Sequence, residues 1–216
     1  YCERMARPQK IWLFRITHFK NLSHILTNGL VTEKSPKANP NFVKIGDQSF
    51  IQYRKDLDAC DPPGRNLSEY IPFYLGPRSP MLYQVATGFE DVEKFSQEEI
   101  VYIITSVDKI QLYGLDYFFT DGNARSSTST YFANDEDFDK LDWETIYGTY
   151  WKSDETDLRR KDKKQSEFLV KKEVPVSCFD YIGVYSEVAR QKVLALQELL
   201  SVKVPVRVSP RKLYYD

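Results

Sequence analysis

The chain has few of the residues on which common enzyme classes depend. Its three cysteines, Cys2, Cys60 and Cys178, lie far apart and show no CxxC spacing. This pattern argues against a disulfide framework or a zinc site and fits a reducing cytoplasm. Because only two histidines occur, His18 and His24, a histidine-rich metal centre is excluded and we expect no metal. A Ser-His-Asp triad would have to use one of these two histidines.

Common nucleotide-binding and hydrolase motifs are also missing from the sequence. Neither GxGxxG nor GxxxxGK[ST] occurs, which disfavours a Rossmann dehydrogenase and a P-loop NTPase. Neither HExxH nor GxSxG occurs, so metalloprotease and α/β-hydrolase interpretations lose their support. The apolar runs are short and interrupted by charges, so we expect no membrane-spanning segment.

The length and composition fit one globular domain with its own core. The chain has 216 residues, of which 42% are hydrophobic, an ordinary value for a folded protein. The net charge is −1, so a nucleic-acid site would have to be a local patch. Aromatic residues make up 14%; they serve in packing or, alternatively, stack on bases or on nicotinamide.

Strand patterns recur irregularly along the chain. Aromatic and β-branched residues predict strands at 11–18, 70–75, 100–105, 117–120, 167–170 and 181–185, and alternating valines predict a last strand over 202–206. Pro72 would restrict the second of these strands to a sheet edge or a bulge. The segments 31–47 and 121–130 lack periodicity and predict long loops, which are often functional.

Helices are predicted where capping residues meet apolar periodicity. Asn21 would cap a short helix that buries Leu22, Ile25 and Leu26 and ends at Gly29. Further helices are predicted at 49–57, which carries Arg54, from Pro80 after the cap Ser79, from Ser106 to near Gly114, and over 135–151 and 154–164. Ser186-Glu187 opens a last, amphipathic helix, whose apolar face would carry Val188, Val193, Leu196, Leu199 and Leu200. The mixed order of strands and helices predicts the α+β class in one domain.

A carboxylate stands at the mouth of the predicted strand 167–170. Residues 159–164 read RRKDKK, and Gln165-Ser166-Glu167 then leads into the strand. A strand end would fix Glu167 while leaving it open to a cleft, as a catalytic carboxylate requires. The alternative, which the local sequence alone favours, is an edge-strand charge that prevents sheet pairing. The cations either follow the phosphates of a nucleic acid or form a solvated helix face.

Four segments occur in a specific order and spacing. They are Phe14-Arg15-Ile16-Thr17-His18 with Asn21-Leu22; Arg54 ahead of Pro62-Pro63-Gly64; Tyr70 to Tyr83, which reads YIPFYLGPRSPMLY; and Gln165 to Val170, which reads QSEFLV. Together they resemble the DarT family, toxins that transfer ADP-ribose from NAD to single-stranded DNA. The resemblance spans nearly the whole chain after residue 10, so we expect a variable lead at 1–10 and a DarT-like domain at 11–216.

The resemblance implies an ADP-ribosyltransferase-like split β core with flanking helices, which holds NAD in a cleft. Glu167 and Arg54 would be catalytic, with Glu167 stabilising the positive charge that develops on the ribose. Arg15 and Tyr74 would surround the nicotinamide ribose. Many family members carry histidine where this chain has Arg15, so its side-chain contacts would differ. Arg54 would either stabilise the deprotonated thymine or bind the NAD phosphates.

The remaining site residues follow from their neighbourhood in this resemblance. Thr17, His18 and Asn21 would meet the ribose and adenosine parts of NAD, although His18 could equally be structural, and Arg54 would also contact NAD. The residues expected to contact DNA are Gln165, Lys163, Lys164, Arg160, Asn123 and Arg125. Gln165 would project to the same side as Glu167 if the chain is extended there.

The resemblance predicts an NAD-dependent mono-ADP-ribosyltransferase that modifies a thymine in single-stranded DNA. NAD is the expected co-substrate, and the expected partners are single-stranded DNA and an antitoxin with a macrodomain (DarG in this family). The protein would be a cytoplasmic monomer and the toxin of a toxin–antitoxin pair. Two alternatives remain: the same fold modifying RNA, protein or a free nucleotide, and a catalytically silent nucleic-acid-binding module.

Overall fold

A large β-sheet organises the molecule, as a computed structural model describes it for residues 5–46, 58–59 and 65–215. The strands are β1 (Trp12–His18), β2 (Leu30–Val31), β3 (Asp58–Ala59), β4 (Arg65–Asn66), β5 (Tyr70–Tyr74), β6 (Ile100–Ser106), β7 (Tyr117–Thr120), β8 (Tyr131–Phe132), β9 (Glu167–Lys171), β10 (Glu173–Val174), β11 (Tyr181–Val184) and β12 (Val206–Val208). The helices are α1 (Leu22–Asn28), α3 (Pro80–Thr87), α4 (Val107–Leu112), α5 (Trp143–Tyr147), α6 (Arg160–Lys163), α7 (Glu187–Leu200) and α8 (Pro210–Leu213).

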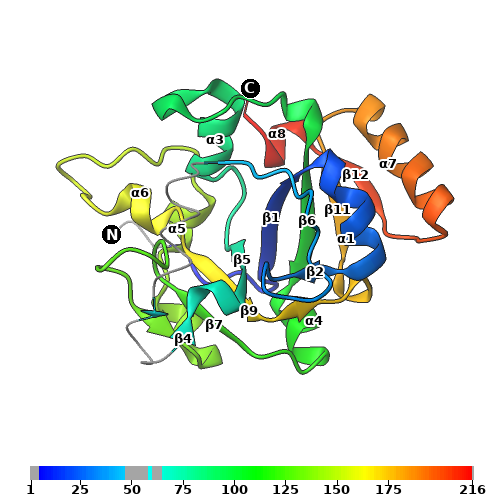
Figure 1. Ribbon diagram of the computed structural model, residues 1–216. Coiled ribbons are helices and arrows are strands. Elements are labelled where there is room, and N and C mark those ends of the chain that lie inside the picture. Colours follow the sequence, from blue (N-terminus) through cyan, green and yellow to red (C-terminus); the bar gives the residue numbers. More distant parts are fainter. Residues whose placement is uncertain (1–4, 47–57, 60–64, 216) are drawn as a thin grey trace.

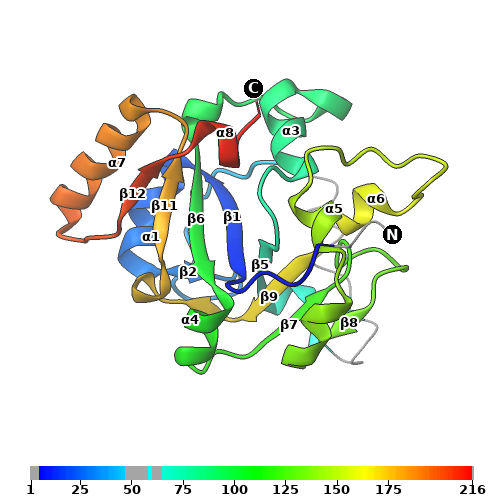
Figure 2. The same cartoon turned by 180° about the vertical axis from the view of Figure 1, so that it is seen from behind.

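The main sheet has the strand order β12-β11-β6-β1-β5-β9-β7-β8 (Figure 1). Strands β1 and β6 pair along the whole of Trp12–His18, and β5 pairs with β9 along the whole of Tyr70–Tyr74. In contrast, β1 and β5 meet at the single pair Phe14 and Tyr74. The sheet is therefore split between β1 and β5, with four strands on each side (Figure 2). The expected α+β class with a split β core is confirmed.

Apolar residues on both faces of the central strands bury the sheet between two layers. Alternation along β6 sends Val101 and Ile103 into the larger cluster, which α1, α4 and α7 cover, and Tyr102 into the smaller one, to which α3 and α8 contribute. The half-sheet around β9 is packed by aromatic rings, and the rings of Phe119 and Phe138 stack at 3.9 Å between centroids. The larger cluster includes residues from both halves of the sheet, such as Ile103 and Phe168, and so joins them on one face.

Local capping signals placed several helix ends correctly. The Ser79 hydroxyl accepts from the Leu82 amide at the start of α3, and Ser186 caps α7 in the same way. Helix α1 ends at Gly29, whose φ of 77° is left-handed and where a Cβ would lie 2.5 Å from the Val174 carbonyl oxygen. Glycine is therefore required there both by the backbone conformation and by the close approach of β10.

Other predictions about secondary structure were wrong or lie outside the described residues. Pro72 lies in an interior strand, but it faces the split, where β5 lacks a continuous neighbour, so its missing N–H leaves no gap in a ladder. The expected helices over 135–151 and 154–164 are shortened to a 3-10 turn, α5 and α6. The final strand begins at Val206 instead of Val202. The predicted helix at 49–57 lies outside the described residues.

The apolar face predicted for α7 was also partly wrong. Val193 is buried as expected, but Val188 and Leu199 are exposed, the latter by 81%. Ala189 and Gln197 take their places against the sheet. Gln197 is tolerated there because its amide binds both the N–H and the C=O of Val204, at 2.6 and 3.0 Å.

The start of β9 is anchored by a buried lysine. The Nζ of Lys164 donates to the carbonyl oxygens of Ile146 and Gly148, both at 2.7 Å, and the residue is only 1% exposed. Gly76, just beyond β5, packs against the same carbonyl of Ile146, where a Cβ would lie 2.2 Å from the oxygen. Lys164 therefore ties the end of α5 to the turn that precedes Glu167.

We predict that raising the pH from 7 to 10 stabilises the protein relative to a Lys164→Met variant. Burial, with a contribution from Arg78, lowers the pKa of Lys164 to about 7, whereas an unfolded lysine has a pKa of about 10.4. Between these values the unfolded chain binds more protons, so stability rises with pH by up to about 1.4 kcal/mol per unit. Thermal unfolding of both proteins measures the difference, and parallel pH profiles would contradict the prediction.

Candidate active site

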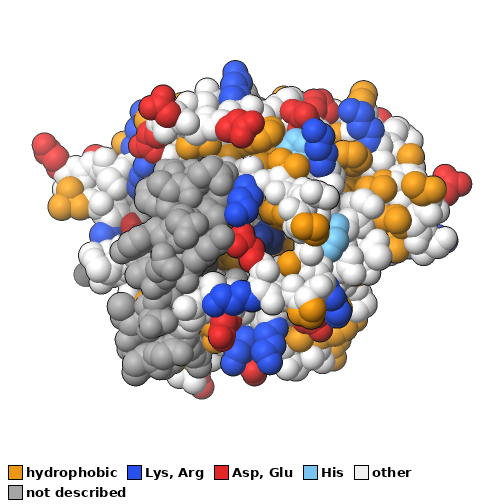
Figure 3. All heavy atoms as spheres, in the orientation of Figure 1, with side chains coloured by type: hydrophobic (Ala, Val, Ile, Leu, Met, Phe, Trp, Pro, Cys, Tyr) orange, Lys and Arg blue, Asp and Glu red, His pale blue; other side chains and the backbone are white. Residues whose placement is uncertain are grey.

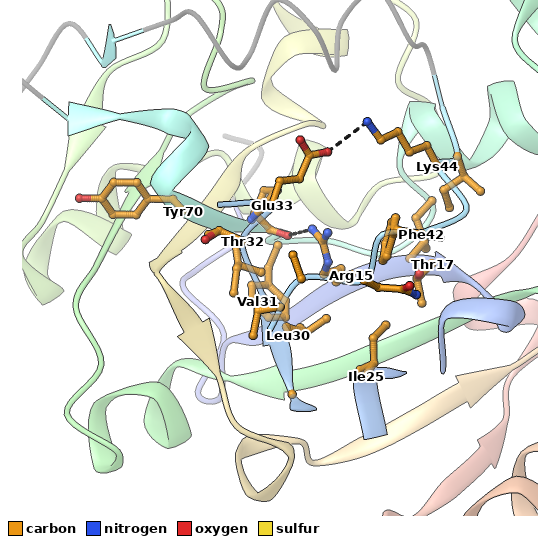
Figure 4. A pocket seen from close by; sticks show the side chains of 18 of the residues that line it. Arg15, Thr17, Ile25, Leu30, Val31, Thr32, Glu33, Phe42, Lys44 and Tyr70 are labelled. Atoms are coloured by element: carbon orange, nitrogen blue, oxygen red, sulfur yellow. Dashed lines mark hydrogen bonds and ion pairs between the residues drawn. The ribbon is translucent and has the colours of Figure 1, made fainter. Parts of the chain in front are cut away.

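A cavity of about 280 Å³ lies along the split of the sheet. One wall comes from β1 and β5, and Glu167 lies at the start of β9 beside them. The opposite wall comes from α1, β2 and the loop that follows β2 (Figure 4). In the space-filling view, charged side chains of both signs surround a hollow near the middle of this face (Figure 3). Four of the predicted site residues line the cavity: Arg15, Thr17, Tyr74 and Glu167.

Glu167 is held at the cavity by strands on both sides. It is the direct antiparallel partner of Tyr74, so their side chains leave the sheet on the same face. Its backbone N–H donates to the hydroxyl of Thr120 at 3.2 Å, and the preceding carbonyl, of Ser166, accepts from Leu75 at 3.0 Å. Glu167 is 3% exposed. The carboxylate therefore has a fixed backbone and faces a cavity instead of bulk solvent.

Arg15 crosses the split. Its guanidinium Nη1 donates to the carbonyl oxygen of Pro72 at 2.8 Å (Figure 4). This carbonyl belongs to the part of β5 that does not pair with β1, so the arginine takes the place of a missing ladder bond. The expected position beside the cavity is observed, and the side chain also joins the two halves of the sheet.

The three polar residues predicted beyond Arg15 have different environments. Thr17 lines the cavity, but neither His18 nor Asn21 does. His18 is buried; its Nδ1 accepts from the Lys20 amide at 3.1 Å, and burial lowers its pKa even though Glu99 lies nearby. This is the structural role that the sequence left open for it. Asn21 stands at the N-terminal cap of α1 but makes no capping bond, contrary to expectation.

The loop after β2 contributes residues that the sequence did not single out. Phe42 and Lys44 line the cavity, as does His24 of α1. Lys44 and Glu33 form an ion pair of 3.2 Å across the opening, above Arg15 in the view of Figure 4. The only signal for these residues was the length of the loop 31–47, because no motif marks them.

The residues predicted to read DNA bases come together beside Glu167. The Asn123 amide donates to Gln165 Oε1 at 3.4 Å, and the Asn123 oxygen accepts from both the backbone N–H and the Nε of Arg125, each at 3.1 Å. The loop 121–130 is thereby attached to the turn before β9. Gln165 itself lies in that turn, so the argument from an extended chain does not apply to it; its Nε2 donates to the carbonyl of Lys161.

The basic run before β9 is largely neutralised by carboxylates. Lys163 pairs with Asp142 and Asp157, at 3.2 and 2.9 Å, and Arg160 pairs with Asp154. Burial of Lys164, described above, removes it from any surface that DNA could reach. The expectation of a row of available cations was therefore wrong for Lys164 and is weakened for the other two.

The remaining expectations concern Arg54, metals and membranes. Arg54 lies outside the described residues. Within the ranges that the structure describes, no group of three or more histidine, cysteine, aspartate or glutamate residues is placed to hold a metal ion. In the same ranges, no helix has the length and apolar character needed to cross a bilayer.

A family model and several known proteins match most of the chain. The family model described as "ssDNA thymidine ADP-ribosyltransferase, DarT" matches residues 14–215. A DNA ADP-ribosyl transferase of Thermus sp. (strain 2.9) is 35% identical over 210 residues, which cover 96% of this chain and 97% of the relative. A DNA ADP-ribosyl transferase–DNA ADP-ribosyl glycohydrolase fusion protein of Thermosipho africanus is 29% identical over 125 residues, covering 57% of this chain and 30% of that protein.

Solved structures of the Thermus sp. 2.9 protein share the fold. Its complex with ADP-ribosylated ssDNA superposes with a TM-score of 0.86 at 31% identity, covering 98% of this chain and all of the other. Its complex with NAD+ superposes with a TM-score of 0.81, also at 31% identity, covering 96% and 99% of the two chains. The split sheet, the cavity beside Glu167 and these matches lead to one assignment: the chain belongs to the DarT family of ssDNA thymidine ADP-ribosyltransferases.

Proposed function

We propose that the cavity at the sheet split binds NAD and that Glu167 promotes transfer of its ADP-ribose to thymine in single-stranded DNA. The family assignment makes the chain a DNA ADP-ribosyltransferase, and a relative of the same fold binds NAD+. The observation that carries the residue-level proposal is the pairing of Tyr74 with Glu167 at the cavity, with Arg15 across the split.

The chemistry requires charge stabilisation at the ribose. As the bond between nicotinamide and ribose breaks, the pair of bonding electrons leaves with nicotinamide and the ribose carbon gains oxocarbenium character. The Glu167 carboxylate, fixed through its backbone and screened from bulk water, would stabilise this positive charge and hydrogen-bond a ribose hydroxyl. A thymine ring nitrogen loses its proton to water and, as the anion, bonds to the ribose carbon in place of nicotinamide.

The other cavity residues fit the recognition of a dinucleotide. Tyr74 offers a ring beside the carboxylate for the nicotinamide face, and Thr17 offers a hydroxyl further along β1. Arg54 remains the second proposed catalytic residue, because its position in the sequence matches the arginine of the family pattern. It would stabilise the deprotonated thymine or bind the NAD phosphates.

The DNA strand is proposed to approach over the loop 121–130. Gln165, Asn123 and Arg125 form one hydrogen-bonded group, and Gln165 lies two residues before Glu167 along the chain. Amide and guanidinium groups can hydrogen-bond base edges and phosphates. Lys163 and Arg160 are proposed to contact phosphates only where a phosphate can replace the aspartate that each side chain now binds.

A toxin role with a macrodomain antitoxin is the proposed biological setting. The Thermosipho africanus relative joins a DNA ADP-ribosyl transferase to a DNA ADP-ribosyl glycohydrolase in one chain, which supports a partner that reverses the modification. We place the protein in the cytoplasm as a monomer, where it would meet both NAD and DNA.

Incubation of the protein with NAD and short oligonucleotides, followed by mass measurement, tests the proposed reaction. Single-stranded DNA that contains thymine should gain one ADP-ribose, and oligonucleotides without thymine should not. Modification of RNA or protein in place of DNA would favour the alternative acceptors. Binding of DNA without any mass gain would favour a silent binding module.

Glu167→Gln should lower kcat for transfer by at least about 100-fold, because the neutral amide keeps the size of the side chain but loses the charge that stabilises the transition state. Binding of NAD, followed by calorimetry, should persist. Glu187→Gln, at an exposed carboxylate of α7, is the control and should keep full activity. Retention of activity in Glu167→Gln would remove Glu167 from the mechanism.

Arg125→Ala should lower the transfer rate at subsaturating DNA by about tenfold, since a charge-assisted hydrogen bond contributes about 1.5–3 kcal/mol. The KM for NAD should stay unchanged, because Arg125 does not line the cavity. Arg190→Ala on α7, which also removes a half-buried arginine, should leave both constants unchanged. An equal loss in the two variants would argue against base recognition by the loop 121–130.

A further inference from the structure

The loop after β2 forms a wall of the cavity. Side chains attach it at two points, since Lys37 pairs with Glu173 at 3.2 Å and Ile45 is buried in the smaller apolar cluster. Phe42, Lys44 and Ile45 line the cavity from this loop. Within the described residues, most backbone hydrogen bonds of residues 34–45 stay inside the loop. The exceptions are two hydrogen bonds to one side chain outside the loop. That side chain belongs to Asn21.

Asn21 holds the loop through a complete set of amide hydrogen bonds. Its Nδ2 donates to the carbonyl oxygen of Val43 and its Oδ1 accepts from the Val43 N–H, both at 2.8 Å. The second proton of Nδ2 is donated to the hydroxyl of Thr17 at 3.0 Å. Asn21 is 1% exposed and does not line the cavity. It therefore holds the loop after β2 from the side that faces away from the cavity.

We infer that Asn21 is a positioning residue for NAD binding: its side-chain amide fixes the backbone of Val43 and thereby places the two neighbouring side chains, Phe42 and Lys44, at the cavity. This inference rests on the proposed use of the cavity for NAD. It replaces the direct contact with NAD that the sequence suggested for Asn21 with an effect through the loop.

Only an amide satisfies this arrangement. The two groups of Val43 present one donor and one acceptor, and Thr17 presents a hydroxyl that accepts. An aspartate would keep the acceptor for the Val43 N–H but would place an anionic oxygen against the Val43 carbonyl. An alanine would leave both groups of the half-buried Val43 without their partner, which loosens the loop.

The chain contains a matched control for the same kind of bond. Gln197 also binds the N–H and C=O of one valine, Val204, through its side-chain amide. It is 4% exposed and joins α7 to the segment before β12, away from the cavity. Gln197→Ala therefore removes equivalent hydrogen bonds and tests whether a general loss of stability explains any effect of Asn21→Ala.

We expect Asn21→Ala to raise the KM for NAD about tenfold, which corresponds to about 1.4 kcal/mol, and to change kcat at saturating NAD by less than about threefold. Hydrogen exchange of the amides in 34–45 should become faster in Asn21→Ala than in the wild type. Gln197→Ala should leave the KM for NAD and the exchange of this loop unchanged. Asn21→Asp should change both quantities in the same direction as Asn21→Ala and serves in its place if the alanine variant does not fold.

Three results would overturn the inference: unchanged exchange of residues 34–45, faster exchange with an unchanged KM for NAD, or an equal rise of KM in Gln197→Ala. The proposed function fails separately, if the wild type neither binds NAD nor modifies DNA. In that case the comparison of exchange rates still decides whether Asn21 holds the loop, and the link to NAD is refuted.

Discussion

The discontinuity between β1 and β5 is the constraint on which the rest of the structure depends. Antiparallel neighbours normally saturate each other's backbone groups along their length, but here the ladder stops after Phe14 and Tyr74. The freed length of β5 gives the molecule a cavity in the middle of its sheet. It also creates the backbone acceptor that Arg15 binds at Pro72 and permits a proline in an interior strand. The two halves stay joined across the split because the larger apolar cluster takes residues from both, such as Ile103 and Phe168.

Sequence reasoning succeeded where the cause is local. Ser79, Ser186 and Gly29 mark helix ends through contacts within a few residues, and the structure agrees. It failed at 154–164, where Asp154 and Asp157 accept hydrogen bonds from nearby backbone N–H groups and so compete with a helix. It failed again at α7, because the burial of Gln197 depends on Val204 across a turn. Charge pattern alone gave no sign that Lys164 is buried beneath α5.

At the candidate site, too, residues in a sequence motif were predicted and residues placed by long-range contacts were not. The family pattern identified Glu167, Arg15, Thr17 and Tyr74, all of which line one cavity. Residues of the loop after β2 escaped notice because Phe42 and Lys44 belong to no motif and gain their importance from a chain segment folding back over β1. Thr120 was given no role at the site, yet it holds the backbone of Glu167 from the next strand. Contacts of this kind join positions far apart in sequence and have no local signature.

The pairing of cations before β9 has a consequence for how nucleic acid would be held. A phosphate that approaches Lys163 or Arg160 meets a side chain already compensated by aspartate. Binding then exchanges one anion for another and frees few mobile counterions, the process that gives most nucleic-acid complexes their steep dependence on ionic strength. Binding of the strand would therefore depend little on phosphate contacts with these two side chains, and it would weaken less with rising salt than binding to a row of free cations.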